Sequence, residues 1–103
     1  MGRVRLPDQL TCPGCGSTYL HHVRVDVFDR KEDAEQVRRT RVGEAVSVLT
    51  LPNAVSDNPS PRRDALAVHL ECEECGSPST LSIAQHKGET RLYFYPASRS
   101  IDR

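Results

Sequence analysis

Four cysteines in two close pairs constrain this chain more than any other feature of its 103 residues. The pairs are Cys12/Cys15 and Cys72/Cys75, and each begins the same pattern, C-x-x-C-G-S. Two thiolates separated by two residues in a tight turn can reach one metal ion, and two such turns complete a tetrahedral site. The glycine after the second cysteine permits the positive φ that this turn often needs. The pattern therefore predicts one structural Zn²⁺ held by all four cysteines.

The two pairs are separated by 56 residues, whereas zinc fingers commonly have about 15–20 between their pairs. Loop closure costs only about 0.6 kcal/mol for each doubling of loop length. A structural zinc contributes on the order of 10–16 kcal/mol, so the longer loop does not exclude the site.

Three other interpretations of the cysteines compete with a Cys₄ zinc site. Two disulfides suit an exported chain, but the first six residues lack the apolar run of a secretory signal. A thioredoxin-like redox pair requires a helix after the motif, and here strand-like sequence follows. A two-Cys, two-His site could recruit His69, or His21 and His22. The spacing also does not distinguish zinc from iron.

We call each C-x-x-C turn a knuckle: Cys12–Cys15 is the first and Cys72–Cys75 the second. With these two knuckles, the chain resembles the zinc-ribbon superfamily, in which two C-x-x-C turns on β-hairpin-like loops bind one zinc. The resemblance covers residues 10–28 and 64–95, and the long middle segment departs from the family pattern. The stretch Ile83–Thr90 resembles the end of small uncharacterised ribbon proteins of phages and mobile elements. Since zinc ribbons serve in transcription, translation, replication and large assemblies, the resemblance implies a fold more than a function.

Alternating apolar residues predict an all-β fold of about five antiparallel strands in hairpins, with little or no helix. Residues 19–28 alternate, with Val23, Val25 and Val27 on one face and Arg24 and Asp26 on the other.

Val-rich sequence resumes at 41–51, and we expect Val23 to pair with Val46 and Val27 with Val42. Gly43 would then mark a bulge. The charged residues 29–40 between these strands read as a hairpin tip, or alternatively as a short helix over 32–39.

The second half of the chain predicts a further strand and a hairpin. Residues 64–71 alternate with Leu66, Val68 and Leu70 inward. In residues 80–95, a two-residue loop at Lys87-Gly88 pairs Ile83 with Leu92 and Leu81 with Phe94. We expect one domain over 1–103, with an inserted charged hairpin and a Pro-rich crossover loop at about 29–63.

The composition limits both the core and the function. Aromatic residues make up 5% of the chain, so we expect a thin aliphatic core. No apolar run reaches the roughly 18 residues of a membrane span, and we expect an intracellular, cytoplasmic protein. No HExxH, P-loop or GxSxG motif occurs, and a Cys₄ site has no open coordination position, so we expect no enzyme activity and no small-molecule substrate.

Fourteen basic and 14 acidic residues give a formal net charge of zero, which argues against binding polyanions through bulk charge. A nucleic-acid interface would need the basic residues of the middle segment: Arg38, Arg39, Arg41, Arg62 and Arg63. The alternative is that these arginines pair with nearby Glu32, Asp33 and Glu35 on a solvated surface.

Tyr93 and Tyr95 should lie opposite Phe94 on an edge strand, where they could stack on a base, bind a protein partner or cover a second small core. Taken together, the sequence favours a non-enzymatic zinc ribbon that docks onto a larger protein assembly, with a nucleic-acid-binding accessory factor as the alternative.

Overall fold

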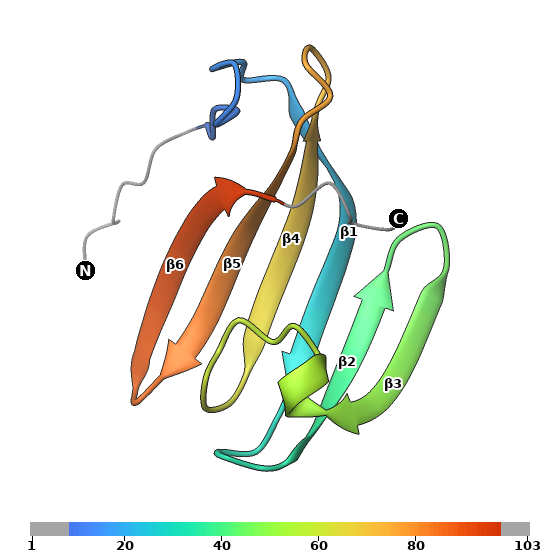
Figure 1. Ribbon diagram of the computed structural model, residues 1–103, viewed down its shortest axis with the longest axis vertical. Helices are drawn as coiled ribbons and strands as arrows, with labels where there is room; N and C mark the ends of the chain where they lie inside the picture. The colour runs from blue at the N-terminus through green and yellow to red at the C-terminus, as the bar shows by residue number, and fades with distance from the viewer. Residues whose placement is uncertain (1–8, 98–103) are drawn as a thin grey trace, which may run out of the picture.

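The computed structural model describes residues 9–97, which form one six-stranded antiparallel sheet in the order β3-β2-β1-β4-β5-β6 (Figure 1). The strands are β1 (Leu20–Asp29), β2 (Gln36–Val42), β3 (Val46–Pro52), β4 (Ala65–Cys72), β5 (Pro78–His86) and β6 (Glu89–Pro96). The only helical segment in this part of the chain is one 3₁₀ turn, η1 (Asn53–Val55). The predicted all-β class is confirmed, with six strands instead of about five.

The β5–β6 hairpin has the predicted register. Ile83 pairs with Leu92, and Leu81 pairs with Phe94. Lys87 and Gly88 form the two-residue loop, with φ values of 51° and 82°. Positive φ at both positions is typical of the type I′ turn, whose twist matches that of the flanking strands.

The predicted pairing of residues 19–28 with 41–51 is wrong. Val42 pairs with Val25, not Val27, and Val46 pairs with Val42 across the next turn, not with Val23. Gly43 lies in that turn, where its N–H donates to the Ala45 carbonyl at 3.1 Å, and is not a bulge.

Of the charged segment 29–40, residues 30–35 connect β1 to β2 as the predicted hairpin tip, whereas residues 36–40 belong to strand β2; the alternative of a helix over 32–39 is wrong. Val37 on β2 is buried, and Arg41 reaches the carboxylate of Asp26 on β1. Burial of Val37 and the ion pair of Arg41 with Asp26 stabilise β2 as a strand despite its many charged residues. The bulge of β1 lies between His22 and Arg24, where its pairing with β4 shifts.

Residues 53–63 cross one face of the sheet, which we call the loop face (Figure 1). The Arg39 guanidinium donates to the Ser56 carbonyl at 3.2 Å, and the Ser60 hydroxyl donates to the Gln85 carbonyl at 2.5 Å. The hydrophobic core lies on this face and is small, as expected. It consists of Phe28, Val37, Ala65, Ala67 and Ala84, with Leu51 packed against it.

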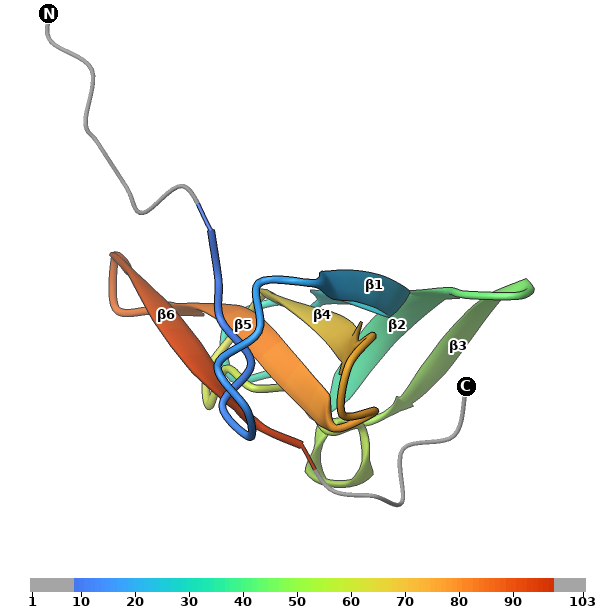
Figure 2. The ribbon, with the colours of Figure 1, turned by 90° about the horizontal axis from the view of Figure 1, so that it is seen from above.

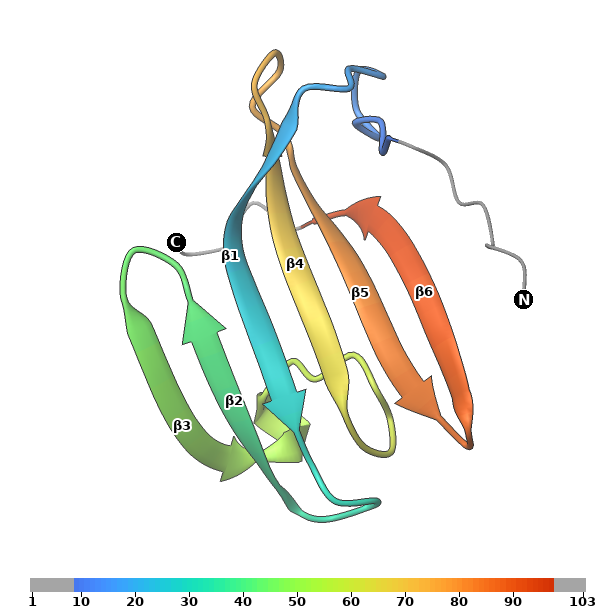
Figure 3. The same ribbon diagram turned by 180° about the vertical axis from the view of Figure 1, so that it is seen from behind.

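The opposite face, which we call the bare face, is apolar and is not crossed by any described segment (Figure 3). The strand register places on it Val25, Val27, Val42, Val46, Val48, Leu66, Val68, Leu70, Leu81, Ile83, Leu92 and Phe94. None of these side chains is buried. The prediction that Leu66, Val68 and Leu70 point inward is therefore wrong, because the small residues Ala65 and Ala67 face the core.

Candidate metal centre

The first knuckle precedes β1 and is a tight turn closed by backbone hydrogen bonds. The Cys12 N–H donates to the Ser17 carbonyl at 2.8 Å, and the Gly16 N–H donates to the Cys12 carbonyl at 2.8 Å. Gly16 has a φ of 82°, the left-handed value that the sequence predicts after the second cysteine. The Gly14 N–H also donates to Cys12 Sγ at 3.3 Å.

The second knuckle connects β4 to β5 and repeats the same geometry. The Cys72 N–H donates to the Ser77 carbonyl at 3.1 Å, and the Gly76 N–H donates to the Cys72 carbonyl at 2.9 Å. Gly76 has a φ of 73°. The repeated C-x-x-C-G-S sequence thus folds twice into one local structure.

Pairing of β1 with β4 brings the knuckles together at one end of the sheet (Figure 1). Leu20, just after the first knuckle, lies opposite Cys72 in the second. The Glu73 N–H donates to the Tyr19 carbonyl at 2.9 Å, joining the two segments directly. Figure 2, from above, shows the first knuckle on the same side of the sheet as η1, which is the side of the loop face.

The four sulfur atoms lie within 4.8 Å of one another and could hold one metal ion. Cys12 Sγ is 3.6 Å from Cys75 Sγ, and Cys15 Sγ is 3.6 Å from Cys72 Sγ. A tetrahedral zinc with Zn–S bonds of about 2.3 Å requires sulfurs about 3.8 Å apart, whereas a disulfide bond is about 2.05 Å long. The spacing therefore fits a shared metal ion, and all four cysteines are free thiols.

The environment of the knuckles divides the thiols by acidity. The hydroxyl of Ser77, with Oγ 3.1 Å from Cys75 Sγ, and then the Ser77 backbone N–H lower the pKa of Cys75 to about 6. The Cys75 N–H lowers the pKa of Cys72. The Ser17 N–H favours the Cys15 thiolate, but hydrogen bonding with Cys75 and the other thiols raises the pKa of Cys15 to about 12. Without a metal ion, the neighbouring sulfurs therefore favour the protonated thiol of Cys15, and metal binding would displace that proton.

The two-Cys, two-His alternative is not supported by the position of His69. Its imidazole lies on the loop face, with Nε2 3.2 Å from Asp26 and Nδ1 3.2 Å from Thr80. Among residues 9–97, the group able to hold a metal ion consists of the four cysteines. His21 forms a contact of 3.5 Å with Glu73 beside the second knuckle.

The five arginines of the alternative nucleic-acid interface do not form one patch. Arg38 pairs with Asp29, while Arg62 lies 2.5 Å from Glu32 and 2.9 Å from Asp33. The contacts of Arg62 are those that the solvated-surface interpretation predicts, whereas Asp29, the partner of Arg38, is not among the acidic residues that it names.

The remaining three arginines divide between the loop face and the crossover. Arg39 and Arg41 lie on the loop face, and Arg63 is exposed on the crossover segment. Tyr93 and Tyr95 lie opposite Phe94 on edge strand β6, as predicted, and are 47% and 42% exposed.

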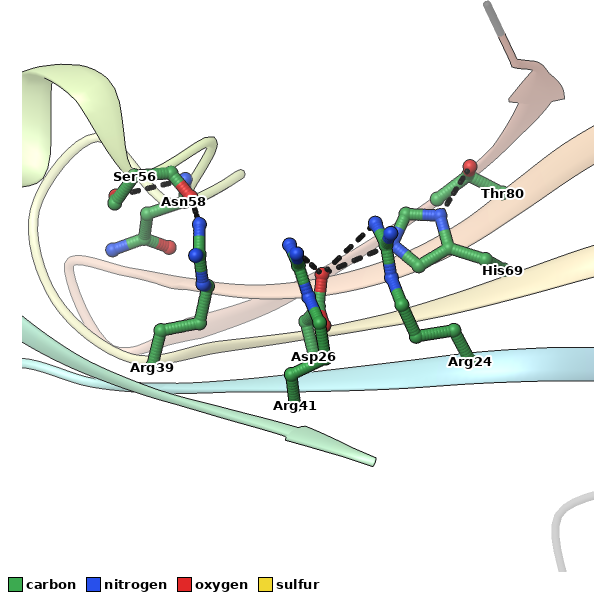
Figure 4. Close-up of polar contacts among 8 residues, drawn as sticks. All are labelled: Arg24, Asp26, Arg39, Arg41, Ser56, Asn58, His69 and Thr80. Carbon is green, nitrogen blue, oxygen red and sulfur yellow. Dashed lines mark hydrogen bonds and ion pairs between the residues drawn. The ribbon is translucent and has the colours of Figure 1, made fainter. Parts of the chain in front are cut away.

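Sequence reasoning missed a buried polar cluster on the loop face, centred on Asp26 (Figure 4). Arg41 contacts both carboxylate oxygens, at 2.9 and 3.2 Å, and Arg24 and His69 approach one of them at 3.3 and 3.2 Å. Burial opposes ionisation, but the hydrogen bonds from His69 and Arg41 and the charge of Arg24 hold the pKa of Asp26 well below its usual range. The alternation of Arg24 and Asp26 with valines is the available signal, but alternation alone does not indicate that the polar face is the buried one.

In comparisons with known proteins, no family model, no curated protein and no solved structure matches the chain. Among residues 9–97, no helix combines the length and the apolar character that crossing a bilayer requires.

Proposed function

We propose that this chain is a non-enzymatic protein-interaction module, in which one structural zinc fixes the end of a single sheet and the bare face docks onto protein within a larger assembly. The observation that carries this proposal is the bare face, because a monomeric protein rarely exposes an apolar patch larger than a few hundred Å² unless it binds something.

A structural role for the metal is supported by the donor set. Four cysteine sulfurs within 4.8 Å of one another would fill the four positions of a tetrahedral zinc and leave none for a substrate. The knuckles also lie at the far end of the sheet from the loop that covers the core, so the metal would stabilise a part of the chain that the small core does not reach.

Interaction through the sheet is supported by the division of its two faces. The loop face buries the core and the polar cluster, whereas every apolar side chain of the bare face retains solvent contact. Globular domains normally pack each apolar sheet face against a second layer. Because residues 9–97 supply no second layer, a protein partner is the structure that would complete this one.

The test is the size of the native complex in cells that naturally make the protein. A chromosomally tagged chain should elute from size-exclusion chromatography well above the mass of two chains. Val68→Lys in the middle of the bare face should remove it from that fraction, and Tyr93→Lys on the loop face serves as the matched control. Elution of the unmodified chain only at the mass of one or two copies would contradict the proposal.

The second candidate, nucleic-acid binding, is favoured by one observation. The register places Arg39 and Arg41 on the same face as the exposed Tyr93 and Tyr95, and arginine with exposed aromatics is the combination that binds single strands. Binding to single-stranded DNA should then weaken with salt and drop in Arg39→Gln and Tyr95→Ala. No binding at low salt would eliminate this candidate.

A further inference from the structure

We propose that the bare face is covered by a second copy of this chain, so that two sheets form one isologous sandwich. This inference rests on the proposed function: the protein that the bare face binds is a second copy of this chain, and the dimer enters the larger assembly through its other surfaces.

Two complete rows of side chains cross all six strands on the bare face. The first row is Val46, Val42, Val25, Val68, Leu81 and Phe94. The second row is Val48, Thr40, Val27, Leu66, Ile83 and Leu92. Apart from Thr40, every member of the two rows is apolar. In a β-sandwich, such apolar rows on the inner faces of the two sheets interdigitate to form the core.

The size of this face meets the requirement of a stable dimer. Five strand spacings of about 4.8 Å give a width of roughly 24 Å, and a height of roughly 20 Å gives about 500 Å² of flat area per copy. Two such faces in contact would remove on the order of 1,000 Å² or more of accessible surface, the lower limit for a specific interface.

The absence of charge in the two rows favours a second copy as the occupant. An isologous contact places the same patch on both sides of a two-fold axis. A charged side chain near the axis would therefore lie against the same charge on the other copy and be repelled. No member of either row is charged, and Asp29 and Arg38 at the end of β1 and the start of β2 neutralise each other. No charge in these two rows therefore opposes a two-fold contact between copies.

Residues 1–8 and 98–103 carry few of the apolar side chains that such a second layer needs. Residues 1–8 and 98–103 contribute only Val4, Leu6 and Ile101 as aliphatic branched side chains. Three such residues are too few to cover two rows that span six strands.

The shape of the sheet indicates which strands make the central contact. The strand order places β1 and β4 in the middle of the sheet, and Figure 2 shows β3 and β6 slanting from the level of β1 toward the side on which η1 lies. Contact between two copies would therefore centre on β1, β4 and β5, where Val25, Val68 and Leu81 form adjacent pairs.

The experiment is sedimentation equilibrium of the full-length, zinc-loaded chain between 1 and 100 µM, concentrations that span the weak-to-moderate affinities expected of an interface this small. With a chain mass of 11.5 kDa, the dimer has twice that mass, about 23 kDa.

Val68→Lys should raise the dimer dissociation constant at least 10-fold. Val46→Lys on edge strand β3 should have a smaller effect, and Tyr93→Lys on the loop face should leave the dimer intact. Val68→Thr, which keeps the β-branched shape, should weaken the dimer while retaining the zinc content and circular dichroism of the unmodified chain.

Two results would overturn the inference: a monomer at 100 µM, or a dimer that Val68→Lys and Val68→Thr leave unchanged. Neither result decides the proposed function. If the monomer still enters a large complex in cells and Val68→Lys removes it, the bare face binds a different protein and only the second-copy proposal fails.

Discussion

Replacing Asp26 with Asn would test whether the polar cluster holds the middle of the sheet together. The Asp26 side chain is 3% exposed, and it accepts from Arg41 and approaches Arg24 and His69. Removing one partner of a buried ion pair costs about 3–5 kcal/mol, because the remaining charges lose their compensation. We expect about 3 kcal/mol, the lower end, because the Arg41 side chain is 29% exposed and water can partly solvate it.

Urea unfolding of the zinc-loaded protein at pH 7 measures this loss. With a slope near 1.5 kcal/mol/M, a loss of 3 kcal/mol lowers the midpoint by about 2 M. The Arg91→Gln variant is the matched control, since Arg91 is 44% exposed and pairs with Glu89 at the surface, and it should cost less than about 0.5 kcal/mol.

A double-mutant cycle separates the ion pair from general disruption. Asp26→Asn combined with Arg41→Gln should cost less than the sum of the two single variants, because the second change removes a charge that the first leaves uncompensated. A loss below about 1 kcal/mol for Asp26→Asn, with additive effects in the double variant, would refute this account of the cluster.

The pH dependence of this loss follows from the low pKa of Asp26. A carboxyl whose pKa is lower in the folded than in the unfolded chain stabilises the fold above the unfolded value of about 3.9 and loses that effect as the pH falls. The destabilisation by Asp26→Asn should therefore persist from pH 8 to 5.5 and be lost only at lower pH. Loss of the destabilisation within this range would contradict the low pKa of Asp26.

Three further changes test the core, a knuckle and a turn. Phe28→Ala removes the largest buried side chain, which is 2% exposed, and should cost about 3–5 kcal/mol in urea unfolding; a cost below 1 kcal/mol would show that the core lies elsewhere. Gly76→Ala should cost about 1–2 kcal/mol from backbone conformation alone, since φ is 73° and no atom lies within 4 Å of the added Cβ; unchanged stability and zinc affinity would contradict that geometry. Lys87→Asn should stabilise the β5–β6 hairpin by about 0.5 kcal/mol, because asparagine tolerates the φ of 51° better, and a lower thermal midpoint would argue against a type I′ turn.

Local patterns in the sequence predicted the parts of the structure that depend on local geometry. The C-x-x-C-G-S repeat predicted both knuckles, including the positive φ of Gly16 and Gly76. The apolar alternation around Lys87-Gly88 predicted the β5–β6 register, because a two-residue loop leaves one pairing that keeps the apolar residues on one face.

Long-range pairing accounts for the parts that sequence reasoning did not reach. Strand β2 was not predicted because residues 36–41 are highly charged and place arginines on both faces of the sheet. The charge of Arg41 is compensated by Asp26 on the neighbouring strand, a contact that depends on long-range pairing. Alternation also identified the two faces of β4 without indicating which one is covered. Val68 looked like a core residue, whereas the smaller Ala67 is the buried one, because the crossover segment packs on that side.

Metal content and thiol accessibility, measured together on protein purified without air, test the central claim most directly. If one metal ion joins both knuckles, native mass spectrometry should find one zinc per chain. Cys12, Cys15, Cys72 and Cys75 should then resist alkylation until a chelator is added, and should react together as the far-ultraviolet circular dichroism changes. A folded chain without metal, in which all four thiols react at once, would contradict the account.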